Sequence, residues 1–282
     1  MGTLHVVSTP IGNLGDLSPR AEETLRAVSR ILAEDTRRSR ILARRAGSTA
    51  PLVSLHEHNE RERTDAVLGW LASGEDLALV SDAGTPLVSD PGAKLVASVL
   101  EAGHRVVPVP GPSAVIAALV VSGLPSERFT FLGFPDRKGR GRQLLLRRCA
   151  EASESVVLFE SPQRLVDLLE ALAGACGSDR LVAVARELTK IHEEVRRGTL
   201  SEVAAYYQAH PPKGEVTLVV APADPESDGE DPEEEARALA RDLVADGMRP
   251  SEAVREIVAR LDLARNDAYR IVHDLEATEA TE

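Results

Sequence analysis

A run of four apolar residues followed by two turns, between Leu77 and Gly92, constrains this chain more than any other stretch. Leu77 to Val80 has no polar residue at either alternating position, so both faces of this strand are expected to be covered, as in a parallel sheet. The side chains of Ala83 to Thr85 are small, and the turn at Asp90 to Gly92 precedes an expected apolar helix. Small residues at the carboxyl end of a buried strand let backbone groups approach a ligand closely, and open α/β sheets bind small molecules there. The alternative is a tight strand-to-helix connection without a ligand.

Four more strands are expected around this one in the first half of the chain. The apolar pattern predicts them at Thr3 to Ser8, Ile31 to Ala33, Leu52 to Leu55 and Arg105 to Val109, with helical spacing between them. Strands that alternate with helices indicate a doubly wound parallel sheet, which we assign to an α/β domain over residues 1–123. Neither a G-x-G-x-x-G after the first strand nor a P-loop motif occurs, so the usual dinucleotide fold and the P-loop fold are not supported.

The pattern changes after Leu124 to Ser126, the expected domain boundary. Strands outnumber helices from here to residue 222, which predicts a mixed α+β domain over residues 124–222. The strands are expected at Phe129 to Phe134, Val156 to Phe159, Leu181 to Ala185, Glu194 to Thr199 and Glu215 to Ala221.

An acidic, proline-containing linker is predicted over residues 223–235, and a small helical module over residues 236–282. Three short amphipathic segments, Ala236 to Ala245, Pro250 to Arg260 and Asn266 to Leu275, suit a three-helix unit resembling a helix-turn-helix. Its last segment offers only Arg265 and Arg270 among many carboxylates, which favours packing or dimer contact over base readout.

The net charge of -12 is unevenly distributed. Residues 222–282 hold 18 acidic and 7 basic residues, which leaves 27 acidic and 26 basic residues in the main body. Bases cluster in that body at Arg37 to Arg45 and at Arg137 to Arg148. Such clusters are either solvated helix faces or contacts for a polyanion, and only further observations decide between these two interpretations.

Cys149 and Cys176 lack the spacing of a metal site or a disulfide framework, so a reducing compartment is expected. The longest apolar segment, Ala114 to Leu124, is too short to span a bilayer, and the amino terminus lacks a signal-peptide pattern. We therefore expect a soluble cytoplasmic protein without a membrane partner.

Four turns rich in glycine, proline and small polar residues follow predicted strands, at Pro10 to Gly12, Asp82 to Pro86, Pro110 to Ala114 and Phe159 to Pro162. If the strands are parallel, these turns lie along one edge and offer backbone groups to a nucleoside-sized ligand. A helix is expected to begin at Pro112 to Ala114, so its free N–H groups are suited to a carboxylate.

Six motifs carry a resemblance to a known family: TPIGNLGD from Thr9, AEDTR from Ala33, LVSDAGTPLVSDPG from Leu79, PGPSA from Pro110, GLPSERF from Gly123 and ARELTK from Ala185. In this order they resemble the bacterial ribosomal RNA small subunit methyltransferase I family, within the tetrapyrrole-methylase-like class of S-adenosylmethionine enzymes. The match runs from residue 3 to about residue 221, and the terminal segment resembles the family's small C-terminal domain.

The resemblance implies a tetrapyrrole-methylase-like two-domain α/β fold and the methylation of the ribose 2'-O of a cytidine in 16S ribosomal RNA. The substrate is either this RNA alone or the RNA within the small ribosomal subunit, and the sequence leaves both open. The resemblance also implies a homodimer, no metal, and S-adenosylmethionine bound between two domains. Carried over by motif, the cofactor site would be lined by Pro10, Asp82, Gly84, Thr85, Leu87, Val88, Ser113, Ala114 and Phe159.

Catalytic candidates in the matching motifs are Glu187, Lys190 and Asp35, since a general base would help to remove the hydroxyl proton. The alternative is that Glu187 and Asp35 form structural ion pairs with Arg186, Arg37 or Lys190. RNA contacts are expected at Arg37, Arg38, Arg137, Lys138 and Arg140. Two other functions stay open: a methyltransferase acting on a small molecule such as a tetrapyrrole precursor, and a non-catalytic nucleic-acid-binding protein.

Overall fold

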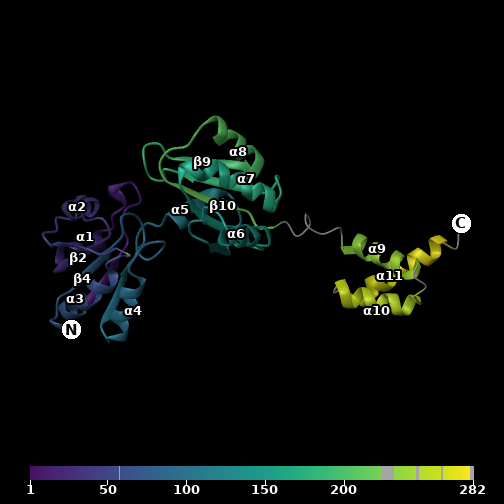
Figure 1. Cartoon of the computed structure of the whole chain (residues 1–282), viewed down its shortest axis with the longest axis horizontal. Helices are drawn as coiled ribbons and strands as arrows, with labels where there is room; N and C mark the ends of the chain where they lie inside the picture. Colours follow the sequence, from purple (N-terminus) through teal and green to yellow (C-terminus); the bar gives the residue numbers. More distant parts are fainter. Residues whose placement is uncertain (57, 224–231, 246–247, 262, 280–282) are drawn as a thin grey trace. The chain divides into compact units, whose positions relative to one another are not determined.

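The computed structural model describes residues 1–56, 58–223, 232–245, 248–261 and 263–279 (Figure 1). The chain forms two compact units, Met1–Pro222 and Ala223–Glu282. The first unit holds two sheets, each with its own helices, and the described residues of the second form three helices.

The first sheet has the order β3-β2-β4-β1-β5, and every neighbouring pair is parallel. Its strands are β1 (Thr3–Val7), β2 (Arg30–Ala33), β3 (Leu52–Ser54), β4 (Leu77–Val80) and β5 (Arg105–Val109). Its helices are α1 (Pro19–Ala27), α2 (Thr36–Arg45), α3 (Glu60–Ala72) and α4 (Ala93–Glu101).

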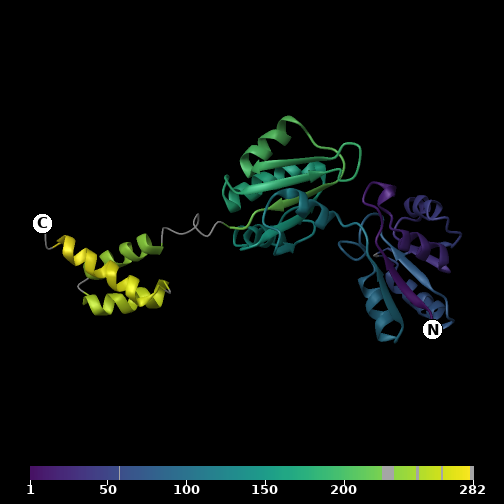
Figure 2. The same ribbon diagram turned by 180° about the vertical axis from the view of Figure 1, so that it is seen from behind.

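Alternate residues of β4 serve opposite faces of this sheet. Ala78 and Val80 belong to the core shared with α1 and α2, whereas Leu77 and Leu79 belong to the core shared with α3 and α4. The strands lie between these helix pairs in the opposite views of Figures 1 and 2. The prediction that both faces of β4 are covered is therefore confirmed, and with it the α/β class.

Helix α3 begins at Glu60. Glu60 is only 6% exposed. Its Oε1 accepts a hydrogen bond of 2.9 Å from the backbone N–H of Leu95 in the first turn of α4, whose N-cap is Gly92. Glu60 thus supplies the side-chain acceptor that the N-cap residue Gly92 lacks. The periodicity of apolar residues in the sequence cannot predict this long-range hydrogen bond.

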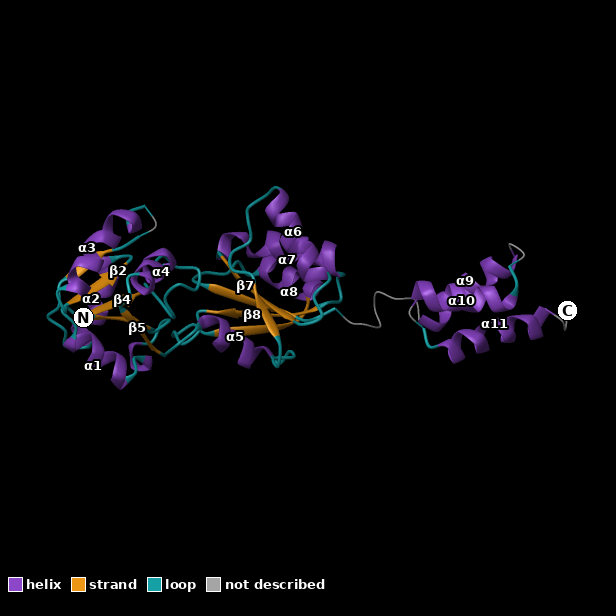
Figure 3. Ribbon diagram, turned by 90° about the horizontal axis from the view of Figure 1, so that it is seen from below, coloured by secondary structure: helices purple, strands orange, loops and turns teal. Residues whose placement is uncertain are grey.

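The second sheet has the order β6-β7-β10-β8-β9, parallel between β6 and β7 and antiparallel elsewhere. Its strands are β6 (Phe129–Phe131), β7 (Ser155–Glu160), β8 (Leu181–Arg186), β9 (Glu194–Thr199) and β10 (Val216–Val220). Helices α6 (Arg140–Ala150), α7 (Leu165–Cys176) and α8 (Leu200–Ala209) share one core with it. Figure 3 shows these helices on one side of its strands.

The opposite face of the second sheet is covered by α5 (Ala114–Ser122). Val115, Ala118 and Leu119 of this helix share a core with β7, β8 and β10. The sequence places this helix at the end of the first domain, over residues 1–123, whereas its packing partner is the second sheet. Arg197 of β9 also donates to the carbonyl of Ser122 at 3.0 Å, near the end of the helix.

The second unit consists of α9 (Pro232–Ala245), α10 (Pro250–Leu261) and α11 (Arg265–Glu279), which enclose a core of small and branched residues. Helix α9 starts at Pro232, inside the stretch 223–235 that was expected to be a linker, because proline is tolerated in the first turn of a helix. Residues 224–231 of that linker lie outside the described residues. Among the described residues, no helix combines the length and the apolar character needed to cross a bilayer.

Candidate functional site

A cavity of about 390 Å³ lies at the carboxyl edge of the first sheet, where it meets the second sheet. Its walls come from the turns after β1, β4, β5 and β7 and from the start of β10. We call it the first cavity; its lining includes Ile11, Asp82, Gly84, Thr85, Val88, Ser89, Asp90, Ser113, Ala114, Phe134, Phe159, Glu160, Glu215 and Thr217.

The turn after β4 is fixed by hydrogen bonds to the turn after β1. Thr9 donates its backbone N–H to the Gly84 carbonyl at 2.8 Å, and Gly84 donates to the Thr9 carbonyl at 3.1 Å. The Ser81 hydroxyl also donates to the Gly84 carbonyl at 3.1 Å. Gly84 has a φ of 81°, which favours glycine, so the backbone passes close to the cavity without strain.

The turn after β5 brings the beginning of α5 to the same cavity. Thr85 donates its hydroxyl to the Pro112 carbonyl at 3.1 Å and shares another hydrogen bond of 3.1 Å with the Ser8 hydroxyl. The N-cap Ser113 makes no side-chain capping bond. The first N–H groups of α5 therefore receive no hydrogen bond acceptor from the Ser113 side chain and are suited to bind an anionic ligand group.

The second domain adds an aromatic wall. Phe159 lies at the end of β7, with its ring centroid 4.8 Å from that of Phe131 and 5.3 Å from that of Phe134. Phe134 is 56% exposed although it lines the cavity. Aromatic side chains give this wall an apolar face with fixed geometry.

The carboxylates of Asp82 and Asp90 give the lining of the first cavity a negative character. Burial raises the pKa of Asp90 to about 6, helped by repulsion from Glu34 and Asp82 and opposed by a hydrogen bond from Ser81. Burial also raises the pKa of Glu34, and the charge of Asp82 adds to this effect. A cationic ligand group would relieve this repulsion.

The Asp90→Asn substitution is expected to stabilise the ligand-free protein at pH 8. A carboxyl whose folded pKa is raised costs stability once pH rises above its unfolded pKa, and the cost is complete above about 6. The difference in the free energy of unfolding between the variant and the wild type should therefore grow between pH 4 and pH 7. Thermal unfolding across this range measures it, with Asp65→Asn on α3 as the control. A difference in stability between the variant and the wild type that does not change with pH would contradict this account of Asp90.

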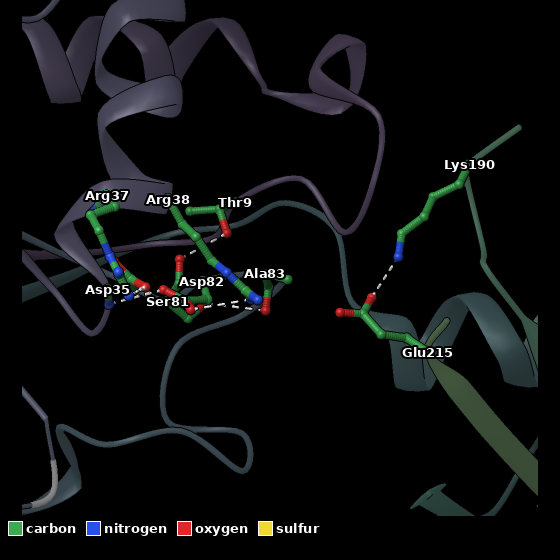
Figure 4. Close-up of polar contacts among 9 residues, drawn as sticks. All are labelled: Thr9, Asp35, Arg37, Arg38, Ser81, Asp82, Ala83, Lys190 and Glu215. Atoms are coloured by element: carbon green, nitrogen blue, oxygen red, sulfur yellow. Dashed lines mark hydrogen bonds and ion pairs between the residues drawn. The ribbon is translucent and has the colours of Figure 1, made fainter. Parts of the chain in front are cut away.

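A second cavity of about 230 Å³ adjoins the first. Both are lined by Ile11, Arg38, Asp82, Ala83 and Glu215. The rest of the second cavity comes from the turn after β1, from α2, from Ser81 after β4 and from Lys190. Figure 4 shows the polar residues around this junction.

The three catalytic candidates lie in different surroundings. Asp35 caps α2 and pairs with Arg37 at 2.9 Å. Hydrogen bonds from the Arg37 side chain and backbone lower the pKa of Asp35 to about 2. Asp35 lines neither cavity, so its geometry matches the structural ion pair kept as the alternative.

Glu187 and Lys190 form one network after β8. Glu187 Oε1 accepts from Lys190 Nζ at 2.7 Å and from the Glu215 backbone N–H at 3.1 Å. The hydrogen bond from Lys190 is the main reason that the pKa of Glu187 is lowered. Lys190 lines the second cavity, whereas Glu187 lines neither the first nor the second.

The residues expected at the cofactor are mostly gathered at the first cavity: Asp82, Gly84, Thr85, Val88, Ser113, Ala114 and Phe159. Pro10 instead lines the second cavity, and Leu87 packs against the core between the first sheet and α3 and α4. Sequence reasoning missed the lining residues Asp90, Phe134, Thr217 and Glu215. Asp90 stands inside a quoted motif, so its position was a usable signal.

Five residues were expected to contact RNA. Arg38 lines both cavities, with its guanidinium 3.4 Å from Asp82 Oδ2. Arg37 is bound to Asp35. Arg137, Lys138 and Arg140 are exposed before and at the start of α6, and none of these three forms an ion pair within the part of the chain that the structure describes. Arg142, by contrast, pairs with Asp167 at 2.7 Å.

Comparison with known proteins assigns this arrangement to a family. The sequence matches the family Tetrapyrrole (Corrin/Porphyrin) Methylases over residues 3–204. A Synechocystis sp. protein named ribosomal RNA small subunit methyltransferase I is 47% identical over 277 residues, covering 98% of this chain and 99% of that protein. This chain belongs to that methyltransferase family. A Xylella fastidiosa protein of the same name is 52% identical over 221 residues, covering 78% of this chain and 81% of the relative.

The tetrapyrrole methylase fold is also evident from solved structures. The crystal structure of the methyltransferase CobJ aligns with 79% of this chain and 95% of its own, with a TM-score of 0.61 and 21% sequence identity. This likeness confirms the predicted two-domain α/β fold. Family membership shows that the chain is a methyltransferase, so the non-catalytic alternative is not supported.

Proposed function

We propose that this methyltransferase transfers a methyl group from S-adenosylmethionine to the ribose 2'-O of a cytidine in 16S ribosomal RNA, within the small ribosomal subunit. The observation that carries the proposal is the first cavity, where turns from four strands of two sheets meet. The relatives named ribosomal RNA small subunit methyltransferase I support the choice of substrate. A cytoplasmic homodimer, implied by the sequence resemblance, completes the proposal.

The lining of the first cavity fits the chemical groups of S-adenosylmethionine. Asp82 and Asp90 are suited to its cationic groups, and the start of α5 at Ser113 and Ala114 to its carboxylate. Phe159 and Val88 offer apolar surface to the nucleoside. When bound, this cofactor would supply a methyl group activated by a sulfonium.

The protein's main contribution to such a reaction is position. The turns after β1, β4 and β5 are held together by Thr9, Gly84 and Thr85, so their backbone groups are fixed before any ligand binds. Aligned reactants save up to about 7 to 11 kcal/mol of the barrier relative to free reactants. The second cavity adjoins the first at Asp82 and Glu215, which leaves a place for the acceptor nucleotide.

Ribose methylation should be mapped in ribosomal RNA from cells with and without this gene. The proposal predicts that one 2'-O-methylcytidine in 16S ribosomal RNA disappears with the gene. Calorimetry with S-adenosylmethionine should show binding to the purified protein. Unchanged ribosomal RNA methylation together with methyl transfer to a tetrapyrrole precursor would favour the small-molecule alternative instead.

Charge reversal of Arg137, Lys138 and Arg140 to glutamate is expected to weaken RNA binding at least about tenfold at moderate salt. Losing three phosphate contacts should also reduce the slope of log affinity against log salt by about 2 to 3. Affinity measured over a salt series tests this prediction. The control reverses three exposed bases of the first domain, Arg61, Lys94 and Arg105, which line neither cavity. An equal loss of RNA affinity in both variants would indicate a general effect of net charge and would contradict the assignment of these three residues as RNA contacts.

A further inference from the structure

Glu215 stands at the junction of the two cavities. It immediately precedes β10 and lines both the first and the second cavity. Asp82 is the other carboxylate that lines both. A group at this junction would face a cofactor on one side and an acceptor on the other.

The two carboxylates differ in what already binds them. Asp82 Oδ1 accepts from the Asp35 backbone N–H at 3.1 Å, and its Oδ2 lies 3.4 Å from the Arg38 guanidinium. Glu215 Oε2 accepts from Lys190 Nζ at 2.9 Å. Its Oε1 accepts no hydrogen bond from any residue that the structure describes, and the side chain is 66% exposed. Glu215 therefore keeps one oxygen available for a ligand.

The network around Lys190 fixes the direction of this free oxygen. Lys190 Nζ lies between Glu187 Oε1 at 2.7 Å and Glu215 Oε2 at 2.9 Å. Glu187 Oε1 also accepts the Glu215 backbone N–H at 3.1 Å, so both the backbone and the side chain of Glu215 are held. In Figure 4 the Glu215 carboxylate points toward Ala83 and Arg38, with Lys190 on the other side.

Lys190 itself is a poor candidate for the base. Burial alone would lower the pKa of Lys190, but its hydrogen bonds to Glu187 and Glu215 outweigh burial, and the pKa is raised. The lysine thus stays protonated and acts as a fixed cation. Because it binds Oε2 of Glu215, it orients the carboxylate and leaves Oε1 as the proton-accepting atom.

We infer that the second cavity receives the acceptor ribose and that Glu215 Oε1 accepts the hydrogen bond of its 2'-hydroxyl, then its proton. The inference rests on the proposed function. During transfer the hydroxyl oxygen bonds to the methyl carbon, the methyl–sulfur bond breaks with its electron pair left on sulfur, and the hydroxyl proton passes to Glu215. Because this side chain is largely exposed, the proton then leaves to water.

The first test is a binding measurement that needs no turnover. RNA with a ribocytidine at the acceptor position should bind the wild type about tenfold more tightly than RNA with a 2'-deoxycytidine there, because a hydrogen bond to a carboxylate is lost. Glu215→Ala should remove this discrimination. Glu193→Ala is the control and should keep the discrimination. Glu193 lies in the same turn after β8 as Lys190, and its Oε2 accepts the Thr189 backbone N–H at 2.6 Å, but Glu193 lines neither cavity.

The second test is the rate of methyl transfer. Glu215→Ala and Glu215→Gln should lower kcat by about 10²- to 10⁴-fold, the usual contribution of a general base, with the affinity for S-adenosylmethionine changed less than about threefold. Added formate should partly restore the rate of Glu215→Ala, since a small carboxylate takes the vacated place. A structural role would not respond to formate.

The outcomes separate the two proposals. If the wild type methylates 16S ribosomal RNA but Glu215→Ala keeps both its rate and its preference for ribose, the role of Glu215 is overturned and the proposed function stands. If the wild type neither binds S-adenosylmethionine nor methylates RNA, the proposed function fails, and the inference fails with it. Circular dichroism on each variant checks that the fold is kept.

Discussion

Gly84→Val is expected to weaken S-adenosylmethionine binding at least about 100-fold, equivalent to about 2.7 kcal/mol. Gly84 lines the first cavity with φ at 81°, where a β-branched residue is strained. An added Cβ would lie 3.3 Å from Ile11 Cγ2 and 3.9 Å from the Pro112 carbonyl oxygen. Because Gly84 exchanges two backbone hydrogen bonds with Thr9, the turn cannot move away without losing them. Calorimetry with the purified variant measures the loss.

Gly74→Val is the matched control for backbone strain. Gly74 also has positive φ, 92°, but an added Cβ would meet no atom of the described residues within 4 Å, and Gly74 lines neither cavity. Both variants should lose similar stability, and only Gly84→Val should lose the cofactor. If Gly84→Val bound with wild-type affinity, the first cavity would not be the cofactor site.

Most strands of the fold were predictable from apolar patterning, and their order was not. β4, β5 and β9 have the predicted bounds, and β4 is flanked by the polar residues Asp76 and Ser81. The partner of α5 was not predictable. This helix is apolar on nearly every side, so periodicity gives it no preferred face, and only packing assigns it to the second sheet.

The candidate site was predictable where it depends on turns and not where it depends on long-range pairing. Gly84, Thr85 and Ser113 stand in motifs of small residues at strand ends, and the structure gathers them at one cavity. Glu215 carries no local signal. It reaches the site because β10 runs antiparallel to β7 and β8, so its start lies at the edge where they end.

Leu158→Ala is expected to lower the free energy of unfolding by about 2 to 5 kcal/mol, the usual cost of a cavity left by leucine in a core. Leu158 is fully buried in β7, opposite Leu218 of β10, within the core shared with α6, α7 and α8. Urea denaturation measures the loss. Leu181→Ala at the start of β8 is the control, because Leu181 is 51% exposed and should cost less than about 0.5 kcal/mol.

The same variant tests whether the two faces of the second sheet are coupled. Leu158 faces the helical core, whereas its neighbour Phe159 belongs to the opposite core and lines the first cavity. Under the proposed function, S-adenosylmethionine at 100 times its Kd should add about 2.7 kcal/mol to the stability of the wild type. Leu158→Ala should gain the same increment, because successive residues of a strand point to opposite faces and the truncation leaves Phe159 in place. A much smaller gain would mean that the vacated core lets β7 shift, and that the cavity wall depends on packing behind the sheet.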